Sequence, residues 1–197
     1  MFQGCRKCRR EGEKLMLKGE RCLSPKCAVV RRSYAPGEHG QGFRGKVSQY
    51  GKQLREKQKA KRIYGIDEGQ FARYVTEAEK YVGNRSEGLM QLLEMRLDNV
   101  IYRLGFASSR AQARQYASHG LFTVNGKSVT IPSFQLKVDD VVTPKVTKLF
   151  KELPLNQANI WLEADSKKLS GKVLHRPSRE EIDTPINESL IIEFYSR

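Results

Sequence analysis

The chain has 197 residues and a formal net charge of +14, from 36 Lys and Arg against 22 Asp and Glu. This length allows one or two domains with apolar cores. No stretch approaches the ~18 to 20 apolar residues of a membrane-spanning helix, which excludes a helical membrane protein.

The positive charge is concentrated in the first third of the chain. Residues 1–62 contain 18 Lys and Arg against 5 Asp and Glu, whereas residues 63–197 contain 18 against 17. A basic arm on a nearly neutral body is typical of nucleic-acid-binding proteins. The alternatives are a solubilising tail and attraction to an anionic membrane surface.

Four cysteines lie close together near the N-terminus, as Cys5-x2-Cys8 and Cys22-x4-Cys27. With no apolar signal segment, we expect a cytosolic protein whose thiols stay reduced. Two close pairs on a short linker favour a structural Zn²⁺ held by four thiolates, which leaves no open position for catalysis. An iron–sulfur cluster has the same ligands, and four unrelated buried thiols are the plainest alternative.

Residues 28–50 are basic and rich in glycine, lack a helical period, and are predicted to be extended. Aromatic side chains alternate there with Arg and Lys, a mixture that suits stacking on unpaired bases beside neutralised phosphates. The stacking candidates are Tyr34, His39, Phe43 and Tyr50.

Two helices are predicted next. Residues 51–64 form a strongly basic helix that ends at Gly65. Asp67 and Gln70 then open a second helix, whose apolar residues recur at helical spacing as far as Val82. The two are expected to pack as an antiparallel pair.

A longer core helix is predicted from Ser86 to Gly105 because its apolar stripe is wide. Ser109 is predicted to cap another helix, which runs through Ser118. Arg110 and Arg114 lie one turn apart on it, and two like charges at that spacing repel slightly. We interpret the pair as an anion-binding surface; a solvated polar face is the alternative.

After residue 120 the apolar period changes to two. Phe122–Val124 and Ser128–Ile131 are predicted to form a hairpin through a type I′ turn at Asn125-Gly126. Further strands are predicted at residues 138–143, 160–164, 172–174 and 190–195, and residues 148–153 are compatible with a helix.

These elements predict an α+β fold: a helical N-terminal domain with a four-cysteine knuckle, and an α/β RNA-binding module with two helices on a mainly antiparallel sheet. The expected divisions are residues 1–50 (zinc knuckle and basic extended arm), 51–85 (helical domain packed with the C-terminal segment) and 86–197 (RNA-binding domain). Within the last, the core module spans residues 93–143 and the remaining sheet residues 144–197.

The helix–helix–hairpin segment resembles the RNA-binding module named after ribosomal protein S-four. The paired cysteines and further motifs, in the same order, resemble the bacterial small-subunit ribosomal protein S-four family, zinc-knuckle form, over nearly the whole chain. The motifs are YAPGEHG at 34–40, LREKQK at 54–59, IYG at 63–65, RLDNV at 96–100, PINE at 185–188 and IEFYSR at 192–197.

The resemblance implies a structural protein, not an enzyme, that binds small-subunit (16S) rRNA early, nucleates assembly of the 5′ domain, and contributes to decoding accuracy. It implies a cytoplasmic ribosome location beside other small-subunit proteins, especially S-five, with mRNA as a further candidate partner. No membrane and no small-molecule substrate is expected. The residues predicted to contact RNA are Arg9, Arg10, Arg31, Arg32, Tyr34, His39, Arg44, Lys46, Tyr50, Lys52, Arg55, Lys59, Arg62, Arg96, Arg110, Arg114 and Lys127.

Other proteins could use the same module. A stand-alone translational regulator or a ribosome-associated factor is the main alternative. An RNA-modifying enzyme would need a separate catalytic domain, for which the chain has neither a motif nor sufficient length. A double-stranded DNA binder is disfavoured because no helix is paired with a dimerisation element.

Overall fold

The computed structural model describes residues 4–42, 46–81, 84–147, 150, 160–165 and 168–196. Two compact units divide the chain: unit 1 is Met1–Val75 with Pro185–Arg197, and unit 2 is Thr76–Thr184. The divisions that the sequence predicts near residues 50 and 85 stay a prediction. No helix in the described part of the chain is long and apolar enough to cross a membrane.

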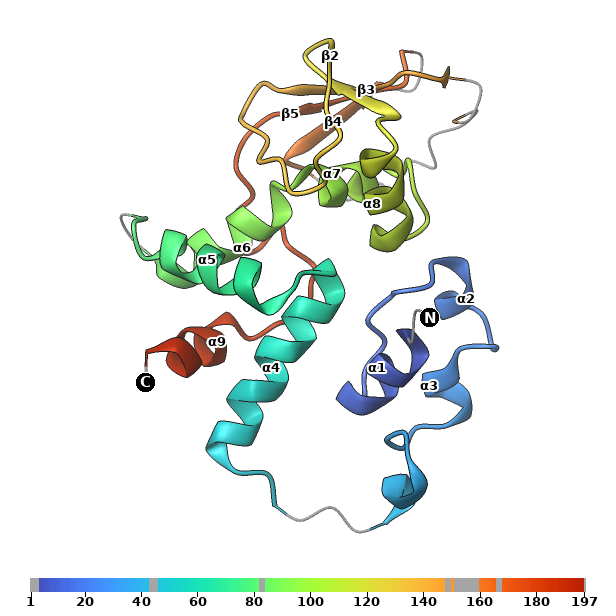
Figure 1. Ribbon diagram of the computed structural model, residues 1–197, viewed down its shortest axis with the longest axis vertical. Coiled ribbons are helices and arrows are strands. Elements are labelled where there is room, and N and C mark those ends of the chain that lie inside the picture. Colours follow the sequence, from blue (N-terminus) through green and yellow to red (C-terminus); the bar gives the residue numbers. More distant parts are fainter. Residues whose placement is uncertain are drawn as a thin grey trace. The chain divides into compact units, whose positions relative to one another are not determined.

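Unit 1 is helical. Its elements are α1 (Gly4–Glu11), α2 (Glu20–Leu23), α3 (Ala28–Arg31), the 3-10 turn η1 (Glu38–Gln41), α4 (Gln49–Tyr64), α5 (Glu68–Ala78, which runs past the unit boundary) and α9 (Glu188–Tyr195) (Figure 1). The prediction of an extended arm over residues 28–50 is therefore wrong in part, because α3 and η1 are short helical turns within it.

Helix α4 ends at Gly65 as the sequence predicts, but it begins at Gln49, two residues before the predicted start at residue 51. The Ser48 side chain accepts a hydrogen bond from the Gly51 N–H at 3.1 Å, and Gly65 ends the helix with φ 65°. The next helix starts as predicted, since Asp67 Oδ1 accepts the Gln70 N–H at 2.7 Å. Both signals are satisfied within one turn, so sequence suffices to place them.

The final segment is a helix, and the strand predicted at residues 190–195 is wrong. Asn187 caps α9, accepting a hydrogen bond from the Leu190 N–H at 3.4 Å. The helix lies alongside α4 (Figure 1), where Gln53 Nε2 donates to Glu193 Oε2 at 2.8 Å. A short apolar run fits both the helical and the extended period, so packing on α4 decides between them.

Unit 2 places three helices beside one sheet. The helices are α6 (Arg85–Glu94), α7 (Leu97–Arg103) and α8 (Arg110–Ser118). The antiparallel sheet has the order β2-β1-β3-β5-β4, from β1 (Phe122–Val124), β2 (Lys127–Ser128), β3 (Val141–Pro144), β4 (Leu162–Asp165) and β5 (Ser170–Val173). The predicted α+β fold class is confirmed.

The single helix predicted from Ser86 to Gly105 is instead two helices, α6 and α7, that meet at Arg96. Arg96 is extended, with φ −71° and ψ 140°, and bridges to Gln135. The Leu97 N–H donates to Phe134 O at 2.9 Å, and the Leu136 N–H donates to Met95 O at 2.9 Å. Hydrogen bonds from a distant loop thus replace the helical ones at this point, which no local pattern reveals.

The predicted hairpin is confirmed, although β2 is shorter than expected. Asn125 and Gly126 have φ 50° and 77°, as a type I′ turn requires. The strand predicted at 138–143 begins only at Val141, because Asp139 adopts φ 71° in a preceding turn. Strand β4 begins two residues later than predicted, and β5 begins two residues earlier. Residues 148–149 and 151–153 of the suggested helix lie outside the described residues.

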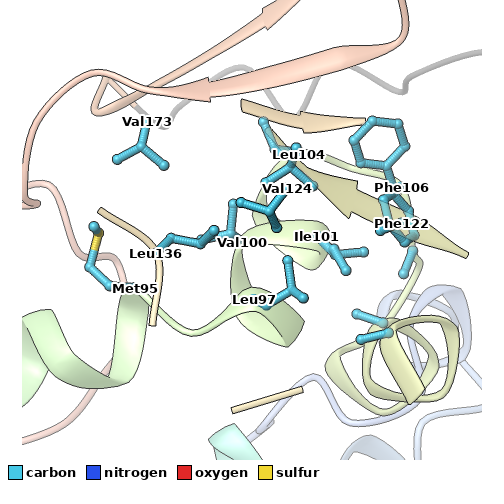
Figure 2. Packing of buried hydrophobic residues seen from close by; sticks show 14 of the residues in the cluster. Met95, Leu97, Val100, Ile101, Leu104, Phe106, Phe122, Val124, Leu136 and Val173 are labelled. Atoms are coloured by element: carbon cyan, nitrogen blue, oxygen red, sulfur yellow. The ribbon is translucent and has the colours of Figure 1, made fainter. Parts of the chain in front are cut away.

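The core of unit 2 lies between α7 and the sheet. Leu97, Val100, Ile101 and Leu104 of the α7 segment lie beside side chains of β1 and β5 (Figure 2). A Cβ atom added to Gly171 of β5 would lie 2.2 Å from Leu104 Cδ1. Glycine at that position is therefore what lets α7 approach the strand closely.

Candidate nucleic-acid interface

The four cysteines line one small pocket in unit 1. Cys5, Cys8, Cys22 and Cys27 surround a cavity of about 10 Å³, the size of a single water molecule or ion. Backbone amides point at two of the sulfurs: Lys18 N–H donates to Cys22 Sγ at 3.3 Å, and Leu15 N–H donates to Cys8. Burial, and then the neighbouring thiols, raise the pKa of Cys8.

The donor set of this pocket suits a thiophilic metal, because thiols from two separate segments line it. The side chains as placed do not form a closed centre. Among the described residues, no group of three or more His, Cys, Asp or Glu could hold a metal ion. The four cysteines thus share one pocket, and the zinc knuckle with its metal stays a prediction.

Most of the predicted contact residues in the arm and α4 are exposed. Arg10, Arg31, Arg32, His39, Lys46, Tyr50 and Lys52 are exposed, while Arg9, Tyr34, Arg55 and Arg62 are half-buried. Arg44 and the stacking candidate Phe43 lie outside the described residues. Arg10, His39 and Arg55 line an open hollow of about 760 Å³.

Arg9 and Tyr34 bind one another, which fixes the start of the arm on α1. Arg9 Nε donates to Tyr34 O at 2.9 Å, and its Nη2 donates to Ala35 O at 3.2 Å. The guanidinium carbon lies 4.7 Å from the centre of the Tyr34 ring. Cation–π contact therefore already uses one face of this ring, and the other contacts anchor the backbone.

Lys59 has an internal role that its charge alone does not reveal. It is 6% exposed, and its Nζ lies 2.8 Å from Glu13 and 3.5 Å from Glu56. Arg55 and Arg62 pair with the buried Glu11. Burial raises the pKa of Glu11, although Arg62 and Arg55 oppose that effect. Glu11 and Glu13 tie the end of α1 and the residues after it to α4. Lys59 therefore does not present its charge to a phosphate.

Unit 2 presents a second basic surface on α8 and the hairpin. Arg114 is 47% exposed, and Lys127 lies exposed beside the turn. Arg110 is only 13% exposed at the first residue of α8. Its Nε donates to Asn99 Oδ1 at 2.8 Å, and its guanidinium carbon lies 4.6 Å from the centre of the Tyr102 ring. The predicted arginine pair is thus present, with one member held in place.

Arg96 is a correction to the predicted contact set. Its side chain is 0% exposed and donates to both carboxylate oxygens of Asp98, at 3.0 and 2.7 Å. A fully buried guanidinium reaches a phosphate only if the unit opens. Arg96 therefore stabilises the junction of α6 and α7 rather than the outer surface.

Sequence reasoning missed the buried polar residues beneath α8. Glu94, Asp98 and Asn99 are 0%, 4% and 1% exposed. They lie in the segment 86–105, which the sequence predicts as the core helix. The available signal was the run of charged and polar residues at 94–99 within that segment, because a buried polar side chain must find partners.

Comparison with known proteins covers 98% of the chain. Residues 1–94 match the family model "Ribosomal protein S4/S9 N-terminal domain", and residues 95–142 match the "S4 domain". A relative called "Small ribosomal subunit protein uS4", from Heliobacterium modesticaldum, is 59% identical over 201 residues. The proteins called uS4 in Acetivibrio thermocellus and uS4A in Clostridium botulinum (strain ATCC 19397 / Type A) are each 56% identical. Each alignment covers 98% of this chain and 96% of the relative.

Proposed function

The chain belongs to the small ribosomal subunit protein uS4 family, and from this premise we propose that it is a structural, non-enzymatic protein that binds 16S rRNA in the small subunit. One structural observation carries the proposal: arginine and lysine side chains stand exposed on helices and a hairpin whose backbones are held by caps and a packed core. Rigid cationic surfaces suit the phosphates of a folded RNA.

Binding would proceed by charge neutralisation and shape recognition. The exposed residues of the arm and α4 meet backbone phosphates, and each contact releases counterions, adding about 0.7 to 0.9 to the slope of log K against log salt. Arg114, Arg110 and Lys127 would fix the position and orientation of the protein on the RNA. Because the A-form major groove is too narrow for side chains, recognition reads helix junctions, 2′-hydroxyls and unpaired bases.

The test is a binding titration of the purified chain. A transcript of the 16S 5′ domain is compared with a stem-loop of equal length at several salt concentrations. We expect a clear preference for the domain transcript and a steep salt dependence. Equal affinity for the two RNAs would contradict the proposal.

We further propose that the protein joins the subunit early, influences decoding accuracy, and contacts neighbouring small-subunit proteins, especially S-five, in the cytoplasmic ribosome. Family membership and the resemblance support this. A stand-alone regulator that binds mRNA is the second candidate. Sedimentation distinguishes them, since a structural protein stays with the small subunit through a high-salt wash and a factor leaves.

We also propose that the cysteine pocket binds a structural Zn²⁺ through Cys5, Cys8, Cys22 and Cys27. When bound, the ion would cross-link two chain segments and thereby stiffen the arm. The four sulfurs around one cavity and the amides of Leu15 and Lys18 support this. Elemental analysis should find about one zinc per chain and none in a Cys22→Ser, Cys27→Ser variant. Iron with visible absorption would favour a cluster instead.

A further inference from the structure

Two buried carboxylates lie beneath the arginine pair of α8. Glu94 and Asp98 are four residues apart, as are Arg110 and Arg114. Arg110 Nη2 lies 4.0 Å from Glu94 Oε1, and Arg114 Nη1 lies 3.9 Å from Asp98 Oδ2. Each carboxylate thus offsets part of the repulsion between the two guanidinium groups.

Glu94 is itself held from within unit 2. Arg103 Nε and Nη2 each donate to one of its carboxylate oxygens, both at 2.9 Å. Thr184 Oγ1 lies 3.4 Å from Oε1. A buried charge persists only when it is paired and hydrogen-bonded, and these contacts satisfy that requirement. Glu94 is therefore a fixed point against which other groups can be oriented.

Asn99 connects Glu94 to Arg110. Its Nδ2 donates to the Glu94 backbone O at 2.9 Å and to Glu94 Oε2 at 2.7 Å. Both amide hydrogens are thereby used, which leaves the amide oxygen to accept the Arg110 Nε–H at 2.8 Å. With the Tyr102 ring against its guanidinium, Arg110 is held by two contacts of different kinds.

Asp98 has a similar arrangement. Both of its oxygens accept hydrogen bonds from the buried Arg96, as described above, and Arg114 approaches Oδ2. Burial raises the pKa of Asp98, while Arg96 and Arg114 oppose that effect. Arg96 thus supplies the charge that makes a carboxylate tolerable at this depth, and Asp98 can attract the exposed Arg114.

We propose that Glu94 and Asp98 are positioning residues for RNA recognition, which fix the guanidinium groups of Arg110 and Arg114 before the RNA arrives. Holding a long side chain in its bound orientation removes an entropy cost from binding. The inference rests on the proposed function and adds to it: the affinity of the α8 surface depends on two carboxylates that do not themselves face the RNA.

Double-mutant cycles test the proposal, with binding to the 16S 5′-domain transcript as the readout. One cycle combines Glu94→Gln with Arg110→Ala, and the other combines Asp98→Asn with Arg114→Ala. Each arginine change should weaken binding about tenfold. Each carboxylate change should weaken it about threefold to tenfold, the cost of ordering one long side chain. In a chain that already lacks the arginine, the carboxylate change should cost nothing further.

Variants that preserve the buried charge guard against a loss of folding. Asn99→Ala should weaken binding about as much as Glu94→Gln, and only when Arg110 is present. Arg110→Lys keeps the charge but loses the Nε donor to Asn99, and should show a similar loss. Glu163→Gln removes the same charge from the exposed strand β4 and should leave binding unchanged.

The outcomes separate this inference from the proposed function. If a carboxylate change weakened RNA binding as much in the chain that lacks its arginine as in the chain that has it, the positioning role would be overturned. The effect would then be on folding alone. Wild-type binding by both Asn99→Ala and Arg110→Lys would overturn it as well. If the unaltered chain shows no preference for the 5′-domain transcript, the proposed function fails, and this inference fails with it.

Discussion

Replacing Gly171 with alanine should destabilise unit 2. The added Cβ would lie 2.2, 2.4 and 2.9 Å from Leu104 Cδ1, Cδ2 and Cγ. Leu104 is 4% exposed in the core, and β5 is held between β3 and β4, so neither side can withdraw easily. Overpacking of this kind costs about 1–3 kcal/mol. Relief of the backbone entropy of glycine in a strand returns about 0.5–1 kcal/mol.

Because all three contacts are below 3 Å, we expect the upper half of the overpacking range, about 2–3 kcal/mol, and hence a net loss of about 1–2.5 kcal/mol. This corresponds to a midpoint lowered by roughly 4–10 °C for a unit of this size. Fluorescence of Trp161, the one tryptophan of the chain and fully buried in unit 2, reports the transition. A lower midpoint alone is not specific, since many substitutions destabilise a protein. If the clash with Leu104 is the cause, the decrease must depend on Leu104.

A second variant tests whether the destabilisation by Gly171→Ala depends on Leu104. Leu104→Ala alone leaves a cavity and should cost about 2–5 kcal/mol. In the double variant, the methyl group added at residue 171 occupies part of that cavity. The double variant should therefore lose at least about 1 kcal/mol less stability than the sum of the two single-variant losses. Gly69→Ala is the matched control, because its nearest neighbour would be Asp67 Oδ1 at 3.9 Å. An unchanged Trp161 transition in Gly171→Ala, or strictly additive costs, would refute the reasoning.

Three further predictions concern charge and metal. Burial disfavours ionisation of Glu68, but hydrogen bonds from Lys57, Lys61 and Tyr195 outweigh it and lower its pKa from 4.5 to about 2. The contribution of Glu68 to stability is therefore complete above pH 4.5 and is lost as the pH falls from 4.5 through about 2. After solvent screening of this half-exposed group, the contribution is roughly 1 kcal/mol. In an acid titration of stability, Glu68→Gln should lack this loss. Arg110→Ala with Arg114→Ala should weaken rRNA binding more than Lys168→Ala with Lys172→Ala, and equal losses in a filter-binding titration would contradict the role of α8. Chelation of the proposed metal should accelerate amide exchange across residues 5–27 while the hairpin at 122–128 stays protected. Joint melting would show that the pocket is not a separate element.

The basic residues that are exposed for RNA contact are only some of the basic residues in the predicted contact set. Lys59 and Arg96 carry the same charge as Arg31 or Lys52, yet both are buried against carboxylates, Lys59 against Glu13 and Arg96 against Asp98. Whether a cation meets solvent or an internal carboxylate depends on what the fold brings beside it. Charge density along the sequence predicts the presence of a nucleic-acid surface but not its individual members.

Where a structural signal lies within a single turn of the chain, the sequence alone was sufficient to place it. The caps at Asp67 and Ser109, the glycine that ends α4, and the Asn125-Gly126 turn all form as expected, because each satisfies its hydrogen bonds or dihedral needs among neighbouring residues. The sequence motifs also determined the family, which comparison over the full chain established.

Tertiary structure decided what depends on partners far along the chain. Residues 190–195 are helical because α4 offers a packing face, and the core helix breaks at Arg96 because the loop at 132–136 supplies hydrogen bonds there. The carboxylates of Glu94 and Asp98 came to lie under Arg110 and Arg114 by the same route. A buried group must be satisfied by whatever the fold places beside it, and local sequence does not specify those neighbours.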